Sequence, residues 1–163
     1  ASGVSVVGQT NGALQSGQAN AGGNDAFVRK YDANGTELWT GQFGSTLDDF
    51  ALGTAADSTG VYIGGNTNGV LPGQSSLGNQ DAFWRKYDSS GIAVSTSQFG
   101  SANPEQANAM AADASGVYIA GSVSGTLPGQ TGAGSADVYV AKLTTLVGPT
   151  VTYSDNIFQN GTT

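Results

Sequence analysis

Carboxylates are the side chains of this sequence that could do chemistry. The 163 residues include 12 Asp and Glu but no histidine and no cysteine. Imidazole and thiolate metal sites, cysteine nucleophiles and histidine-based catalytic triads are therefore excluded. The remaining chemistries are calcium binding by clustered oxygen ligands and glycoside hydrolysis by two acids about 5–10 Å apart.

The pattern of acids favours neither chemistry. No Asp-x-Asp-x-Asp-Gly loop is present, and an aspartate that starts a strand or a turn ordinarily caps it. The acids considered for calcium are Asp25, Asp48, Asp49, Asp81 and Asp137. Only Glu37 and Glu105 add to the aspartates, and nothing in the sequence juxtaposes two acids. We therefore expect no metal site, no cofactor and no enzymatic activity.

The elements that carry these acids recur at a fixed interval. Asp25 lies 56 residues before Asp81, which lies 56 residues before Asp137. The segment Asp-Ala-Phe-x-Arg-Lys-Tyr-Asp-x-x-Gly begins at the first two positions, and the third begins the altered form Asp-Val-Tyr-Val-Ala-Lys-Leu. Self-similarity at a fixed period indicates an array of supersecondary units.

Each complete unit is expected to contain four short strands bounded by glycine and Asp-x-x-Gly turns. The first is a run of small residues, read as a strand despite the helix propensity of alanine because a turn closes it after about seven residues. The second reads Gly-Val-Tyr-Ile, the third is the Asp-Ala-Phe segment, and the fourth ends in Gln-Phe-Gly. In the central unit these strands lie at about residues 50–56, 60–65, 81–87 and 92–100.

Units of four antiparallel strands in series are typical of β-propeller blades. We therefore predict an all-β fold, a β-propeller-like array of about three four-stranded antiparallel blades that forms an incomplete ring. The blades are placed at about residues 1–45, 46–101 and 102–147, within one repeat segment, 1–147. Residues 148–163 are expected to form a non-repeat C-terminal tail or an extra strand. Trp39 and Trp84 are expected to pack between blades.

The units resemble the bacterial seven-bladed β-propeller (SBBP) repeat family, over about 2.5 repeats between residues 3 and 143. The resemblance rests on Gly-Val-Tyr-Ile-x-Gly, Leu-Pro-Gly-Gln, the Asp-Ala-Phe segment, Gln-Phe-Gly-Ser and Ala-x-Asp-x-x-Gly. It implies an extracellular or cell-surface bacterial propeller, usually one part of a long multidomain protein, without common catalytic residues. The sequence departs from the family in having about three blades and in losing the pattern after Leu143.

An array of three blades exposes strand edges and blade faces. It fits a piece of a longer ring, a ring or filament built from several chains, or a compact three-blade form. The first unit lacks its small-residue strand, and we hypothesise that the tail of the same or a neighbouring chain supplies the missing pairing. The tail residues assigned to this assembly role are Val151, Tyr153, Ile157 and Phe158.

The long loops between the second and third strands of each unit share one face. Polar loop rims bind sugars or proteins, although the same residues can simply turn and pack the loops. The rim residues named as candidate ligand contacts are Asn11, Gln18, Asn68, Gln74, Ser124 and Gln130.

Charge and hydropathy restrict the partners. The 12 acidic and 5 basic residues give a net charge of −7, which argues against binding to nucleic acids or to anionic membrane surfaces. The sequence contains no apolar run of about 18 residues, so membrane insertion is not predicted. We expect a structural or adhesive module that is secreted and lies outside the cell or on its surface. It would act through protein–protein contacts, and one such role is that of a self-assembling subunit of a surface or filament assembly. Its partners would be other copies of itself or further blades of a longer chain. The alternative is a lectin-like module that binds glycans on the long-loop face.

Overall fold

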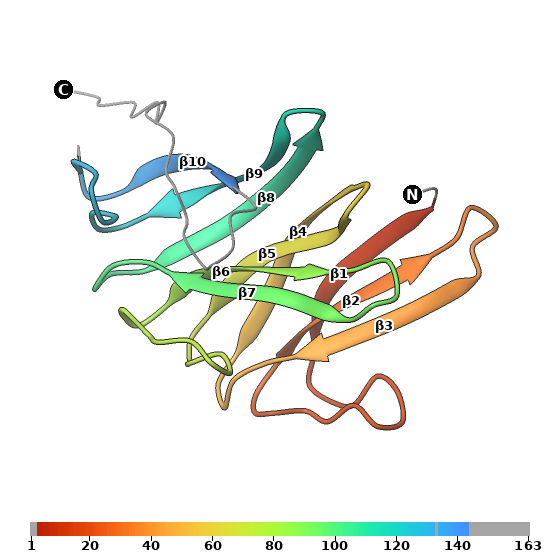
Figure 1. Ribbon diagram of the computed structural model, residues 1–163. Helices are drawn as coiled ribbons and strands as arrows, with labels where there is room; N and C mark the ends of the chain where they lie inside the picture. The colour runs from red at the N-terminus through yellow and green to blue at the C-terminus, as the bar shows by residue number, and fades with distance from the viewer. Residues whose placement is uncertain (1–2, 133, 144–163) are drawn as a thin grey trace.

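The computed structural model describes residues 3–132 and 134–143, and these residues fold as β-structure without a helix. Ten strands form three antiparallel sheets of three, four and three strands (Figure 1). The all-β prediction is confirmed. Nowhere in these two ranges is there a helix that could cross a membrane.

The three sheets follow one another along the chain. The first sheet contains β1 (Val4–Thr10), β2 (Asp25–Tyr31) and β3 (Glu37–Phe43). The middle sheet contains β4 (Asp49–Asp57), β5 (Gly60–Thr67), β6 (Asp81–Tyr87) and β7 (Ala93–Phe99). The third sheet contains β8 (Glu105–Asp113), β9 (Gly116–Val123) and β10 (Asp137–Leu143). In Figure 1 the first and third sheets lie on opposite sides of the middle one, and the described residues form no closed ring.

The strand register of the first sheet recurs in the middle sheet. Ala26 pairs with Phe43 in one, as Ala82 pairs with Phe99 in the other. The turns that follow β2 and β6 also match. The Asp88 carboxylate accepts hydrogen bonds of 2.9 Å from two backbone amides, and Asp32 accepts the equivalent two at 2.8 Å. Gly91 closes its turn with φ of 82°, a backbone conformation that favours glycine.

The small-residue runs are strands β4 and β8, as predicted. These two strands pack against each other at the junction of the middle and third sheets. A Cβ added to Gly53 in β4 would lie only 3.0 Å from the Cα of Ala109 in β8. Larger side chains would force the strands apart, so close packing overrides the helix propensity of alanine.

The hydrophobic core is divided into two clusters, each between neighbouring sheets. Alternate residues of β6 point to opposite clusters, so that Phe83 packs on the first sheet and Trp84 packs on the third. Phe83 meets Phe43 edge-on at 5.4 Å, and Tyr87 stacks on Trp39 at 5.5 Å. The core prediction for the tryptophans is therefore confirmed, since Trp84 is buried and Trp39 packs against a buried cluster.

Candidate interaction surfaces

The outward face of the first sheet exposes positions that are covered in the middle sheet. We call this surface the first end face and define it by Val4, Val6, Phe27, Arg29 and Tyr31. Cross-strand pairs place these side chains together, because Val4 lies opposite Tyr31, and Val6 opposite Arg29. Val4 is 59% exposed, whereas its counterpart Val61 in β5 is 4% exposed because the first sheet covers it.

The outward face of the third sheet has the same character. This last end face is defined by Tyr118, Val138, Val140 and Lys142 on β9 and β10. Val140 is 42% exposed, whereas its counterpart Trp84 in β6 is 9% exposed beneath the third sheet. The two ends of the described stack therefore display apolar side chains at positions that form sheet junctions elsewhere.

The first sheet also has an open strand edge. The second strand of the middle sheet, β5, pairs with β4 on one side and with β6 on the other. Its counterpart β1 pairs only with β2 among the described residues. An unpaired edge offers backbone hydrogen-bonding groups to an incoming strand. The tail residues predicted to supply that strand, Val151, Tyr153, Ile157 and Phe158, lie outside the described residues.

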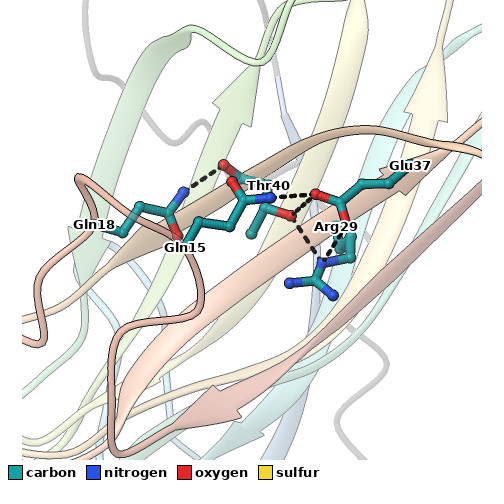
Figure 2. A network of polar contacts seen from close by, with 5 residues as sticks. All are labelled: Gln15, Gln18, Arg29, Glu37 and Thr40. Atoms are coloured by element: carbon teal, nitrogen blue, oxygen red, sulfur yellow. Dashed lines mark hydrogen bonds and ion pairs between the residues drawn. The ribbon is translucent and has the colours of Figure 1, made fainter.

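A polar network borders the first end face (Figure 2). The Arg29 Nε lies 2.8 Å from the Thr40 hydroxyl and 3.4 Å from the Glu37 carboxylate. Thr40 donates a 2.9 Å hydrogen bond to Glu37, and the loop side chain of Gln15 donates to the same carboxylate. Gln18 donates to the Thr40 carbonyl oxygen at 2.6 Å. The network fixes the Arg29 guanidinium on this face and holds the β1–β2 loop against β3.

The long loops and the connections between sheets share one rim, as expected. The Asp49 amide donates to the carbonyl of Asn24, and the Glu105 amide donates to that of Gln80. Three of the predicted rim side chains hold loops in place. Gln18 bonds Thr40 as described, Gln74 accepts from the Gln98 amide at 3.0 Å, and Asn68 accepts from Gln80 at 3.0 Å.

The other predicted rim residues lie in the turns of the same loops. Asn11 lies in the turn where the Thr10 hydroxyl donates to the carbonyl of Gly12. The amides of Ser124 and Gln130 donate to the carbonyls of Pro104 and Leu127. The structure thus places all six residues at one rim, and glycan binding there stays a prediction.

Two buried carboxyl pairs were missed by sequence analysis, and the expectation that no acids come together is wrong. Asp25 of β2 meets Asp49 of β4, and an oxygen of each lies within 2.9 Å of the point where a Cβ on Gly44 would stand. An oxygen of Asp81 and one of Glu105 lie within 2.7 Å of the equivalent point at Gly100. Each pair joins the Asp-Ala-Phe strand of one sheet, β2 or β6, to the first strand of the next sheet, β4 or β8, and all four acids are buried.

The Gln-Phe-Gly-Ser motif builds these sites. Gln98 Nε2 donates to Asp81 at 2.7 Å and to the Gly69 carbonyl at 2.9 Å, while its Oε1 accepts from the Leu71 amide at 3.0 Å. Gly100 leaves room for both carboxyl groups. The Ser101 amide donates to Glu105 at 2.7 Å. A sequence signal was present, since an acid follows the motif glycine by five residues in both units.

One acid of each pair has a raised pKa. Burial raises the pKa of Asp49, and the neighbouring Asp25 charge adds to this effect. Burial likewise raises the pKa of Glu105, with a further contribution from Asp81. Each carboxyl group accepts a hydrogen bond from a backbone N–H, while Asp49 Oδ1 and Asp81 Oδ1 have no partner among the described residues. The described residues contain no cluster of three or more acidic ligands suited to a metal ion. Both pairs lie in the interior, at the junctions between sheets.

Comparison with known proteins adds one partial similarity. No family model matches the sequence. The sequence is 33% identical to the regulatory protein FlaEY of Caulobacter vibrioides over an alignment of 103 residues, which covers 58% of this chain. The matched region spans 11% of that protein's length, so this chain is similar to a small part of a much longer protein.

Proposed function

We propose that this chain is a structural or adhesive module of β-propeller-type blades that acts through protein–protein contacts at its two end faces. The observation that carries the proposal is the exposure of Val4 and Val140 at positions whose counterparts are buried in the middle sheet. Exposed apolar patches on sheet faces indicate interaction surfaces.

The two end faces are complementary by the logic of the internal junctions. At each junction, the face carrying Ala26 and Val28, or Ala82 and Trp84, meets the opposite kind of face on the next sheet. The last end face is equivalent to the faces that carry Ala26 and Val28 or Ala82 and Trp84. The first end face is equivalent to the faces that they meet at the junctions. The third sheet of one copy therefore suits the first sheet of the next.

A contact of this type is heterologous, because two different surfaces meet. Heterologous contacts build a ring where the rotation closes and a filament where it does not. Each valine that becomes fully buried contributes about 1.5–3 kcal/mol, before the cost of association. Further blades of a longer chain would use the same two surfaces.

The proposed setting is a secreted or cell-surface protein. The SBBP-like motifs support the blade assignment and this location. The similarity to a small part of a longer protein is consistent with a module within a larger architecture.

Sedimentation velocity over a range of concentrations tests the proposal. The expected result is a mass that increases with concentration for the native sequence and falls towards one chain for Val140→Lys. Val70→Lys is the matched control, because Val70 is an exposed valine in a loop of the middle sheet, away from both end faces. A single-chain mass at every concentration, or equal loss of association in the control, would contradict self-contact through the end faces.

A further inference from the structure

A cleft lies between the first and middle sheets, at the end opposite the long loops. Its volume is about 270 Å³. The residues that matter for its chemistry are Lys30, Leu38 and Trp39 of the first sheet and Asp57, Ser58 and Ser89 from two turns of the middle sheet. The size is slightly below the ~300–1,000 Å³ of pockets for drug-sized ligands, so it suits one ring.

The cleft is associated with two residue differences between equivalent cross-strand rows of side chains in the middle and first sheets. In the middle sheet the row across β5, β6 and β7 is Tyr62, Lys86 and Ser95. There the Lys86 ammonium lies 5.1 Å from the centre of the Tyr62 ring.

The corresponding row of the first sheet is Ser5, Lys30 and Trp39. Serine replaces the tyrosine on one side of the lysine, and tryptophan replaces serine on the other. The ring that supports the lysine in the middle sheet is therefore missing in the first.

The exchange leaves two polar groups without partners. Lys30 is only 5% exposed, and it makes no hydrogen bond, ion pair or ring contact with any described residue. The Ser5 hydroxyl is also buried without a hydrogen-bond partner in the described part of the chain. The Lys30 nitrogen is not among the fully buried atoms, so the alkyl stem is covered while the ammonium borders the cleft. The cleft therefore offers a cation that no described residue pairs with and that a ligand in the cleft can reach.

We propose that this cleft binds a hydroxylated ring that carries a carboxylate, as in a uronic-acid residue. The ligand carboxylate pairs with Lys30 in a charge-assisted hydrogen bond. The apolar face of the ring lies on Trp39 and Leu38, with Trp39 held by its stacking on Tyr87. Ring hydroxyls donate to Asp57 or exchange hydrogen bonds with Ser58 and Ser89.

The proposed site is distinct from both end faces and from the long-loop rim. Self-association through the end faces can therefore fail without affecting ligand binding, and the reverse also holds. A neutral sugar would leave Lys30 unpaired, which makes the carboxylate the determinant of binding.

Saturation-transfer NMR with the full chain tests the site, with D-glucuronate as the probe and D-glucose as the neutral counterpart. Glucuronate signals are expected to receive saturation, whereas glucose signals are not. Lys30→Met should weaken glucuronate binding about tenfold or more, because it removes the paired charge. The matched control is Lys86→Met, which changes the equivalent lysine of the middle sheet and should leave binding unchanged.

A second variant tests the geometry. Ser5→Tyr restores the ring found at the equivalent position of the middle sheet and should weaken binding, because that ring would engage the Lys30 ammonium as Tyr62 engages Lys86. Thermal melting shows whether each variant folds. If Ser5→Tyr does not fold, the result for Lys30→Met tests the proposal. Absence of saturation transfer to glucuronate, equal transfer to glucose, or equal losses in Lys30→Met and Lys86→Met would each overturn the proposal.

Discussion

Replacing Gly44 by alanine should destabilise the junction between the first and middle sheets. The added Cβ would lie 2.4 Å from Asp25 Oδ1 and 2.9 Å from Asp49 Oδ2. Both distances are below van der Waals contact, and neither carboxyl group can move into solvent because both residues are fully buried. Moving Asp49 would also stretch its 2.6 Å hydrogen bond from the Ser45 amide.

The expected cost follows from overpacking. Inserting a methyl group into a close-packed interior usually costs about 1–3 kcal/mol. In a chain of this size that loss corresponds to a decrease in melting temperature of roughly 2–12 °C. Gly100→Ala should fall in the same range, because its Cβ would lie 2.3 Å from Glu105 Oε2.

Urea denaturation and thermal melting measure both variants. Gly12→Ala is the matched control, because its Cβ would meet no atom within 4 Å and its backbone does not require glycine. The reasoning is refuted if Gly44→Ala is as stable as the control, since the two carboxyl groups would then not occupy the space beside Gly44.

Two further predictions concern the same junctions. Because the pKa values of Asp49 and Glu105 are raised, their stabilising contribution is complete below pH ~4 and is lost as the pH rises through their folded-state pKa values. In urea titrations, the double variant Asp49→Asn with Glu105→Gln should therefore lose less stability between pH 4 and 7 than the native sequence. Gln98→Ala should lower the free energy of unfolding by about 1–3 kcal/mol for each buried group left without a partner. Gln42→Ala should lower it less, because Gln42 is partly exposed. Equal stability of Gln98→Ala and the native sequence would show that the loop is not held by this side chain.

The strands could be predicted because their signals are local. Glycine and Asp-x-x-Gly turns bound short β-branched and aromatic runs, and every described strand lies where these signals placed it. The small-residue strands were the hardest case, because alanine favours helix. The turn after Asp57 indicated a strand, and the close approach of Gly53 to β8 explains why the residues are small.

The carboxyl pairs were not predicted because they depend on contacts between sheets, and the recurring five-residue spacing of glycine and acid does not show which second acid lies opposite. Asp25 and Asp49 each look like a local cap, and only the stacking of the first sheet on the middle sheet brings them together. The cleft at Lys30 was not predicted from the sequence for a related reason. Its origin is a difference between equivalent rows, in which Ser5 and Trp39 depart from Tyr62 and Ser95, whereas the search for repeats emphasises what the units share.

Ring closure and the tail strand remain predictions. Three stacked sheets can continue into further copies or into further blades of a longer chain. The end faces nevertheless specify how any continuation should be built, with a last end face against a first end face.

Mixing two blocked variants tests that central claim most directly. Val6→Lys blocks the first end face and keeps the last, while Val140→Lys blocks the last and keeps the first. Each variant alone should sediment at the chain's 16.2 kDa mass, and the mixture should stop at twice that mass, because only one intact pair of faces can form. A mixture that remains at the single-chain mass, or a variant that dimerises alone, would contradict head-to-tail contact between the end faces.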